Sequence, residues 1–253
     1  MVVEASLVLA VLIPVLLFLS LSYTRHALYE VEAQHMEKVK TAFFQLKSSI
    51  ERSQLGERAV VTISLGRDPI PNVVPFLPLL VGGTSRGTGT LLFDNSAGGR
   101  VVFYSQNSEY ADLQLILENG AVILSQEGRE TMLFPPAMLA IRKGEKIDVY
   151  HQVFELVGEN FQLSGGGEIS LELLVENICE ESENRENLEI TFSRGQHENA
   201  WWEFLLAENF WLSQRGYEVR LESLEDSFRL NINGPLHYIQ RRYVVAVKRV
   251  AKA

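Results

Sequence analysis

The histidines and the single cysteine are the residues of this chain with the widest catalytic and metal-binding chemistry, and their spacing argues against both uses. The histidines are scattered, and no two form the H-x-x-x-H or H-E-x-x-H pair that places two imidazoles on one helix face for zinc. Cys179 stands beside Glu180 and Glu181, so it lacks the electropositive surroundings that make a thiolate reactive. No G-x-S-x-G nucleophile elbow occurs. We therefore predict that the chain is not an enzyme and uses no cofactor or metal. The histidines are His26, His35, His151, His197 and His237.

Charge is unevenly distributed along the chain. Residues 1–56 hold five acids and five bases, so the formal net charge of −9 comes from the remainder, with 27 acids and 18 bases. An acidic body argues against nucleic acid as a partner, because phosphate neutralisation needs a concentrated basic face. Seven glutamates stand between Glu172 and Glu189, but without a D-x-[DN]-x-[DN]-G pattern they favour a solvated acidic loop over a calcium site. The basic end of the chain is interpreted either as pairing with acidic neighbours in an assembly or as a charged edge strand. It comprises Arg241, Arg242, Lys248, Arg249 and Lys252.

Aromatic side chains are clustered in residues 197–214, HENAWWEFLLAENFWLSQ. They could form a carbohydrate-binding face. However, Trp201, Phe204 and Leu212 recur at helical spacing, which favours a helix packed on a sheet. Trp202 is the residue that we expect to remain outside.

The element that organises the chain is its beginning. Residues 5–23 form an apolar run without a charged side chain, which as a helix would span about 28 Å, close to the hydrocarbon thickness of a bilayer. The sequence then continues without Gly or Pro to Leu55, and its apolar residues keep helical spacing. We predict one helix on the order of 80 Å long. Its rear apolar stripe needs a partner, which is either the helices of other subunits or the head's own sheet.

The residues before the run, Met1-Val-Val-Glu4, lack the basic stretch of a secretory signal peptide. Two orientations remain open. If the chain is an anchor written from its true start, Arg25 would hold the body inside the cell. If a basic leader has been removed, the body lies outside, and this is the alternative that we favour.

The remainder, residues 56–253, has the pattern of a β-rich head, and residues 1–55 form the preceding helical domain. About ten short strands with turn signals every 8 to 12 residues predict a sandwich or barrel-like body. Asn119-Gly120 predicts a tight hairpin. Four prolines in residues 67–78 predict an extended connection. The predicted fold class is α+β: a long hydrophobic helix and an all-β, sandwich-like head with one short covering helix.

This architecture resembles that of archaeal type IV pilins, the class that includes archaellins. Parts of the head are also similar to archaeal pilin-like surface proteins. These parts are residues 110–124, Phe134-Pro-Pro136, Leu163-Ser-Gly-Gly-Gly167 and the segment from Ala200-Trp201 to Gly216. The resemblance implies a prepilin peptidase that removes the leader, an assembly machinery, and a helical homopolymer that is membrane-inserted only before assembly. The acid stands at Glu4 rather than at the fifth mature residue of bacterial pilins. Glu4 therefore either contacts a neighbour's N-terminal amine, or lies at a headgroup surface or faces water.

We therefore expect a major pilin-like subunit of an extracellular filament at the cell surface, with a role in adhesion or surface attachment. N-terminal helices would bundle in its core and the heads would lie outside. A single-pass, membrane-anchored extracellular binding module and a minor tip pilin are the alternatives. The residues predicted to build the filament core are Glu4, Leu7, Val11, Pro14, Phe18, Leu21, Leu28, Val31, Val39, Phe43, Leu46 and Ile50.

Overall fold

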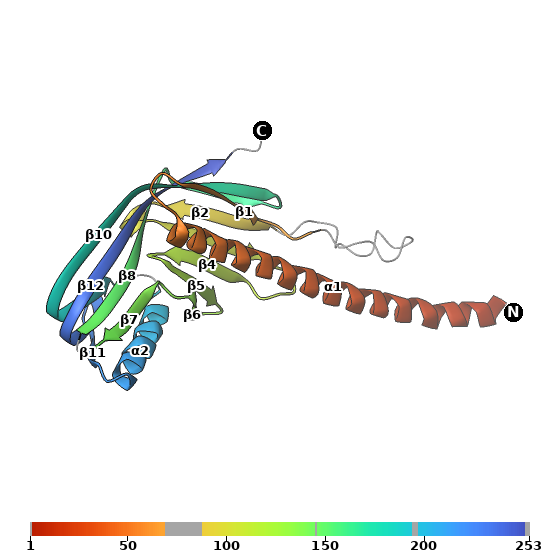
Figure 1. Ribbon diagram of the computed structural model, residues 1–253. Helices are drawn as coiled ribbons and strands as arrows, with labels where there is room; N and C mark the ends of the chain where they lie inside the picture. Colours follow the sequence, from red (N-terminus) through yellow and green to blue (C-terminus); the bar gives the residue numbers. More distant parts are fainter. Residues whose placement is uncertain (1, 69–87, 145, 194–196, 251–253) are drawn as a thin grey trace.

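The computed structural model describes residues 2–68, 88–144, 146–193 and 197–250. It opens with helix α1 (Val2–Arg52), a single element of 51 residues, which confirms the predicted continuous helix. At about 1.5 Å per residue, α1 is roughly 75 Å long. Its second half lies across the head and its first half projects beyond it (Figure 1). The predicted proline-rich connection lies outside the described residues from residue 69 onward.

The strands that the structure describes form two open six-stranded sheets. The first has the order β1-β10-β12-β8-β7, with β11 paired to β12, and only its β12–β8 pair is parallel. The second is antiparallel throughout, in the order β6-β5-β4-β3-β2-β9. A long apolar helix followed by a mainly β domain with a short helix is the α+β class predicted from the sequence. The strands are β1 (Arg58–Ser64), β2 (Thr88–Asp94), β3 (Arg100–Gln106), β4 (Leu113–Glu118), β5 (Ala121–Gln126), β6 (Arg129–Phe134), β7 (Met138–Lys143), β8 (Lys146–Val157), β9 (Phe161–Gly165), β10 (Glu168–Ser193), β11 (Glu218–Ser223) and β12 (Ser227–Val250), and a 3-10 turn (Ser96–Gly98) joins β2 to β3.

The hairpin between β4 and β5 confirms one short-range prediction. Asn119 and Gly120 have φ values of 44° and 78°. Positive φ at both central positions is what a tight type I′ turn requires, and Asn followed by Gly adopts it most readily. The turn fixes the register in which Glu118 faces Ala121.

The long strands β10 and β12 overturn two expectations. The acidic stretch is not a loop: it lies within β10, which pairs with β12 along nearly its whole length. Cross-strand neighbours explain this, because opposite charges on facing residues stabilise a sheet. Glu180 lies opposite Arg241, and their side chains form an ion pair of 2.6 Å. Arg241 and Arg242 of the basic end do not lie on an edge strand either, since β12 runs between β10 and β8 at these positions. Lys248 and Arg249 lie beyond the described β12–β8 pairing and face β10 alone, and Lys252 lies outside the described residues.

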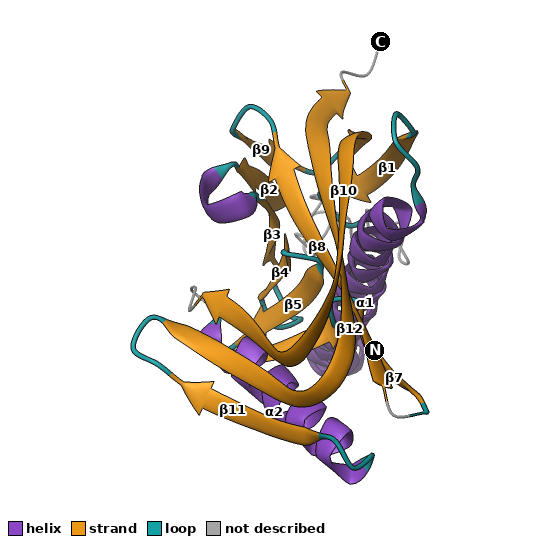
Figure 2. Cartoon of the chain, turned by 60° about the vertical axis from the view of Figure 1, so that its left-hand side comes forward, coloured by secondary structure: helices purple, strands orange, loops and turns teal. Residues whose placement is uncertain are grey.

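Two hydrophobic cores lie on opposite faces of the long strands. One core includes Phe43 of α1 and Tyr243 of β12. The other lies towards the C-terminal helix and includes Trp201 and Ile232. Successive side chains of a strand alternate between faces, so Ile232 and Tyr243 belong to opposite faces of β12. The buried face of β12 therefore changes along the strand, which runs from the side of the head that carries the C-terminal helix to the side that carries α1 (Figure 2).

Helix α2 (Glu198–Gln214) confirms the predicted helix, and it packs against β11, β6 and β12. Trp201 is buried, and its Nε1 donates to Glu118 at 3.0 Å. The expectation that Trp202 stays outside is wrong, because its ring packs 5.2 Å from that of Phe228. On α2 the exposed aromatic residues are Phe210 and Trp211, each 59% exposed.

Candidate functional site

The first half of α1 exposes apolar side chains on all sides. Phe18 is 70% and Leu7 66% exposed. Consecutive residues point about 100° apart around a helix, so a run of exposed residues longer than one turn, such as residues 6–16, covers every face. A helix that is apolar all round is normally buried in protein or lipid. We call residues 6–23 the projecting segment; its exposed large side chains are Leu7, Val8, Leu9, Val11, Leu12, Ile13, Val15, Leu16, Phe18, Leu19, Leu21 and Tyr23.

The second half of α1 differs, because its apolar stripe is buried within its own chain. Val39, Phe43, Leu46 and Ile50 belong to the core formed with both sheets. This corrects their assignment to the filament core. An apolar stripe that recurs every three or four residues must pack against a partner. The sequence allows two partners, the helices of other subunits or the head's own sheet, and in the structure the stripe packs against the sheets of its own head.

Glu32 fixes the point at which α1 leaves the head. Its side chain is 1% exposed, and its carboxylate accepts hydrogen bonds from the backbone N–H groups of Ser108, Glu109 and Tyr110 at 2.9, 2.9 and 2.8 Å. Arg67 adds a charge partner, with its Nε 3.4 Å from Oε1 of Glu32. We call Glu32 together with the β3–β4 loop, residues 107–112, the exit clasp.

Further contacts surround the exit clasp. The rings of Tyr29 and Tyr110 lie 5.4 Å apart, and Arg25 approaches Glu109 at 3.7 Å. Within the loop, Asp112 accepts from the backbone N–H of Asn107 at 2.7 Å, which holds the loop's two ends together. The clasp therefore joins a helix face to a loop that is itself internally bonded.

A second set of contacts joins α1 to the end of β1. His35 is buried, and its Nε2 donates to the carbonyl of Ser64 at 2.9 Å. Lys38 and Asp68 form an exposed ion pair of 3.2 Å. Such exposed pairs contribute little to stability, so the buried His35 contact is the stronger restraint on the helix.

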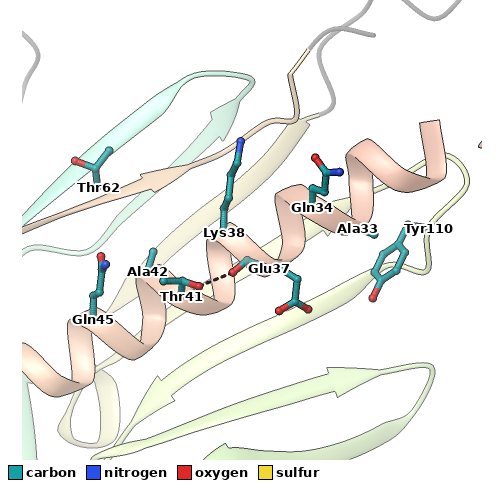
Figure 3. A pocket seen from close by; sticks show the side chains of 9 residues that line it. All are labelled: Ala33, Gln34, Glu37, Lys38, Thr41, Ala42, Gln45, Thr62 and Tyr110. Atoms are coloured by element: carbon teal, nitrogen blue, oxygen red, sulfur yellow. Dashed lines mark hydrogen bonds between the residues drawn. The ribbon is translucent and has the colours of Figure 1, made fainter. Parts of the chain in front are cut away.

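A shallow groove of about 620 Å³ runs along the side of α1 that the head leaves open. Figure 3 shows the side chains of α1 that line it, between Thr62 of β1 and Tyr110 of the clasp loop. Amide, hydroxyl and charged groups lie along the groove. The hydroxyl of Thr41 donates a hydrogen bond to the backbone carbonyl of Glu37 at 2.9 Å. The remaining lining residues are Ala33, Gln34, Lys38, Ala42 and Gln45.

The residues predicted for assembly therefore fall into separate groups. Leu7, Val11, Phe18 and Leu21 are exposed on the projecting segment, and Pro14 lies among them in α1. At the exit, Leu28 is buried and Val31 is partly buried. The remaining four, Val39, Phe43, Leu46 and Ile50, lie in the core, and the side chain of Glu4 lies outside the described residues.

Glu32 is not among the predicted site residues. The signal that identifies it is its position four residues from both Leu28 and Met36, which places an acid on the otherwise apolar stripe.

Within the ranges that the structure describes, the projecting segment belongs to the one helix that is long and apolar enough to cross a membrane, judged by length and composition. In the same ranges, no group of three His, Cys, Asp or Glu side chains is placed to hold a metal ion. Helix α1 thus presents an apolar contact surface, the projecting segment, whose direction relative to the head is fixed. Comparison with protein-family models, with curated proteins and with solved structures finds no match to this chain.

Proposed function

We propose that this chain is the structural subunit of an extracellular helical filament, with projecting segments packed together in the core and sandwich-like heads on the outside. The observation that carries the proposal is the exposure of the projecting segment around its whole circumference. Each fully buried Leu, Val, Ile or Phe side chain contributes about 1.5–3 kcal/mol relative to exposure in water. The segment therefore requires neighbours on every side, which a bundle of such helices supplies.

The rigid connection between segment and head supports assembly over simple anchoring. α1 passes from the projecting segment into the head without a break, and the exit clasp and the buried stripe fix its direction. A helical polymer needs the same angle between core and head in every subunit, because one repeated contact generates the whole filament. An anchor for a binding module needs no such fixed angle.

Under this proposal the subunit is held in the membrane through the projecting segment before assembly. A prepilin peptidase and an assembly machinery would process and extract it, and its principal partner would be other copies of the same chain. Adhesion or surface attachment is the role proposed for the filament.

The alternative is a single-pass membrane-anchored binding module, with a minor tip pilin as a further variant. The projecting segment suits each of them. Burial of the stripe within the head also means that the rear of α1 needs no partner helices. What separates the alternatives is whether projecting segments of different copies touch.

Cysteine cross-linking of surface material tests that contact. In a Cys179→Ser background, which removes the exposed native thiol, Val11→Cys leaves one thiol per subunit and should give disulfide-linked dimers when the native cell surface is oxidised. Val60→Cys, on an exposed position of β1, is the matched control and should not. A Val11→Cys chain that stays monomeric, with no filaments containing this chain in negative-stain images, would overturn the proposal in favour of the anchor.

A further inference from the structure

A polar cavity of about 320 Å³ lies in the head, on the strands that connect the two cores. On β12, Leu236 and Tyr238 are the last residues of the α2-side core, and Gln240 and Arg242 continue the same face. From Tyr243 onward, the opposite face is buried in the α1-side core. The cavity thus occupies the stretch of β12 where its buried face changes. Its lining residues on β8, β10 and β12 and in the β4–β5 turn include His151, Arg185, Tyr238, Gln240, Arg242 and Asn119.

The floor of the cavity is formed by a buried pair of neutral hydrogen-bonding groups. His151 is 5% exposed, and its Nδ1 lies 3.2 Å from the hydroxyl of Tyr238. Burial lowers the pKa of His151 to about 4 and raises the pKa of Tyr238 to about 12. Both side chains are therefore uncharged at neutral pH, and both offer donor and acceptor positions.

The charges around the rim are mostly compensated. Arg185 pairs with Glu183 at 2.6 Å and lies over the ring of Tyr238. Glu189, also in the lining, pairs with Arg229 at 2.8 Å. Glu181 also lines the cavity, opposite Gln240, and among the described residues neither Glu181 nor Arg242 has an ion-pair partner. The lining thus holds two acids, Glu181 and Glu189, and two arginines, Arg185 and Arg242, a balance that disfavours a strongly charged ligand.

Arg242 differs from the other rim arginine. Across the ranges that the structure describes, no acidic side chain lies within ion-pair distance of its guanidinium, so its donors are available to a ligand. The amides of Asn119 and Gln240 add further donors and acceptors, and Asn119 is fixed by the tight turn. Apolar side chains of Val153, Ile190 and Phe192 complete the lining.

We infer that this cavity binds a neutral sugar residue. A pyranose needs many paired donor and acceptor groups for its hydroxyls and an apolar contact for its C–H face, and amides, a neutral His–Tyr pair, a free guanidinium and an apolar patch supply both. The volume lies near the lower end of the range for small-molecule sites, about 300–1,000 Å³, which suits one ring. The inference concerns the head alone and does not depend on filament formation.

Saturation-transfer NMR with the full chain tests the inference, in a detergent without a sugar headgroup. The probes are glucose, galactose, mannose and N-acetylglucosamine, with glucuronate as the charged comparison. At least one neutral sugar should receive saturation. Arg242→Ala should weaken its binding by about fivefold or more, as for loss of one hydrogen bond.

Arg241→Ala is the matched control, since Arg241 neighbours Arg242 on the same strand but points to the opposite face, where it pairs with Glu180. It removes the same charge and should leave binding unchanged. Gln240→Ala provides a second variant inside the cavity and should weaken binding as well. Absence of transfer to every neutral sugar, binding of glucuronate alone, or equal effects of Arg241→Ala and Arg242→Ala would each overturn the inference.

Discussion

The carboxylate of Glu32 accepts the backbone N–H of Tyr110 at 2.8 Å, across a separation of 78 residues in the chain. Together with the hydrogen bonds from Ser108 and Glu109, this contact fixes the point at which α1 leaves the head and continues as the projecting segment. The direction of the projecting segment is therefore set by the buried hydrogen bonds of Glu32 as well as by apolar packing.

Replacement of Glu32 by Gln should destabilise the head by about 2–4 kcal/mol, because an amide cannot accept all three N–H groups and leaves Arg67 without its charge partner. Chemical denaturation of the detergent-solubilised chain would measure this loss. Glu37→Gln is the matched control: Glu37 lies in the next turn, its side chain is largely exposed, and it forms a surface ion pair with Lys40. It should change the free energy of unfolding by less than about 0.5 kcal/mol. If both variants lowered the free energy of unfolding by similar amounts, the exit clasp would not contribute specifically to the stability of the head.

The adjacent residues Phe43 and Phe44 test whether the stripe belongs to the head. Phe43 is fully buried in the core, whereas Phe44 is 43% exposed and its ring packs 4.9 Å from that of Phe134 in β6. Phe43→Ala should lower the free energy of unfolding by about 3–5 kcal/mol, the usual cost of emptying such a site. Phe44→Ala should cost about 1 kcal/mol, the value of one aromatic contact. If Phe43→Ala left an isolated, solubilised subunit as stable as before, the stripe would instead have its main contacts between subunits.

The outcome for α1 shows how much of this arrangement a sequence can predict. Helical spacing and the absence of glycine predict the helix, and Asn119-Gly120 predicts its hairpin, since both signals are local. The partner of a stripe is not local. Phe43 shares one core with Phe103 and Tyr243, and nothing within the helix distinguishes such a core from the helix of another subunit. Glu32 is equally hidden, because its partners are backbone groups without a side-chain signature.

The acidic stretch in β10 illustrates a second limit. Glu180 and its neighbours have the composition of a loop, and they form a strand because Arg241 stands opposite, 61 residues later in the chain. Cross-strand pairing depends on register, which composition does not reveal. The exposure of Phe210 and Trp211 has a similar cause. Helical spacing shows which residues share a face of α2, but the position of the sheet in space decides which of these faces is buried.

Titration of His151 should make the head more stable at neutral than at acidic pH. The pKa of His151 is lowered by burial to about 4 in the folded chain, from 6.5 when exposed. Between these values the unfolded chain binds the extra proton, so stability is full above about pH 6.5 and falls as the pH drops towards 4, by up to about 3 kcal/mol. His151→Gln removes this titration and keeps a partner for Tyr238, so the difference between the two unfolding curves should shrink as the pH falls through this window. A constant difference between wild type and His151→Gln from pH 7 to 4 would contradict the buried, neutral state.

Removal of residues 1–25 should convert the chain into a soluble monomer with an intact head. The deletion takes away the projecting segment and retains Leu28, Glu32 and the buried stripe, so the exit clasp and both cores keep their contacts. Its thermal unfolding midpoint should match that of the solubilised full chain, and light scattering after size-exclusion chromatography without detergent should give the monomer mass. Phe18→Ala in the full chain is a smaller change for comparison. This variant should still require detergent to remain in solution, because the other apolar side chains of the projecting segment would otherwise be exposed to water. A truncated chain that forms filaments without residues 1–25 would place the polymer contacts on the heads and would refute a core built from projecting segments.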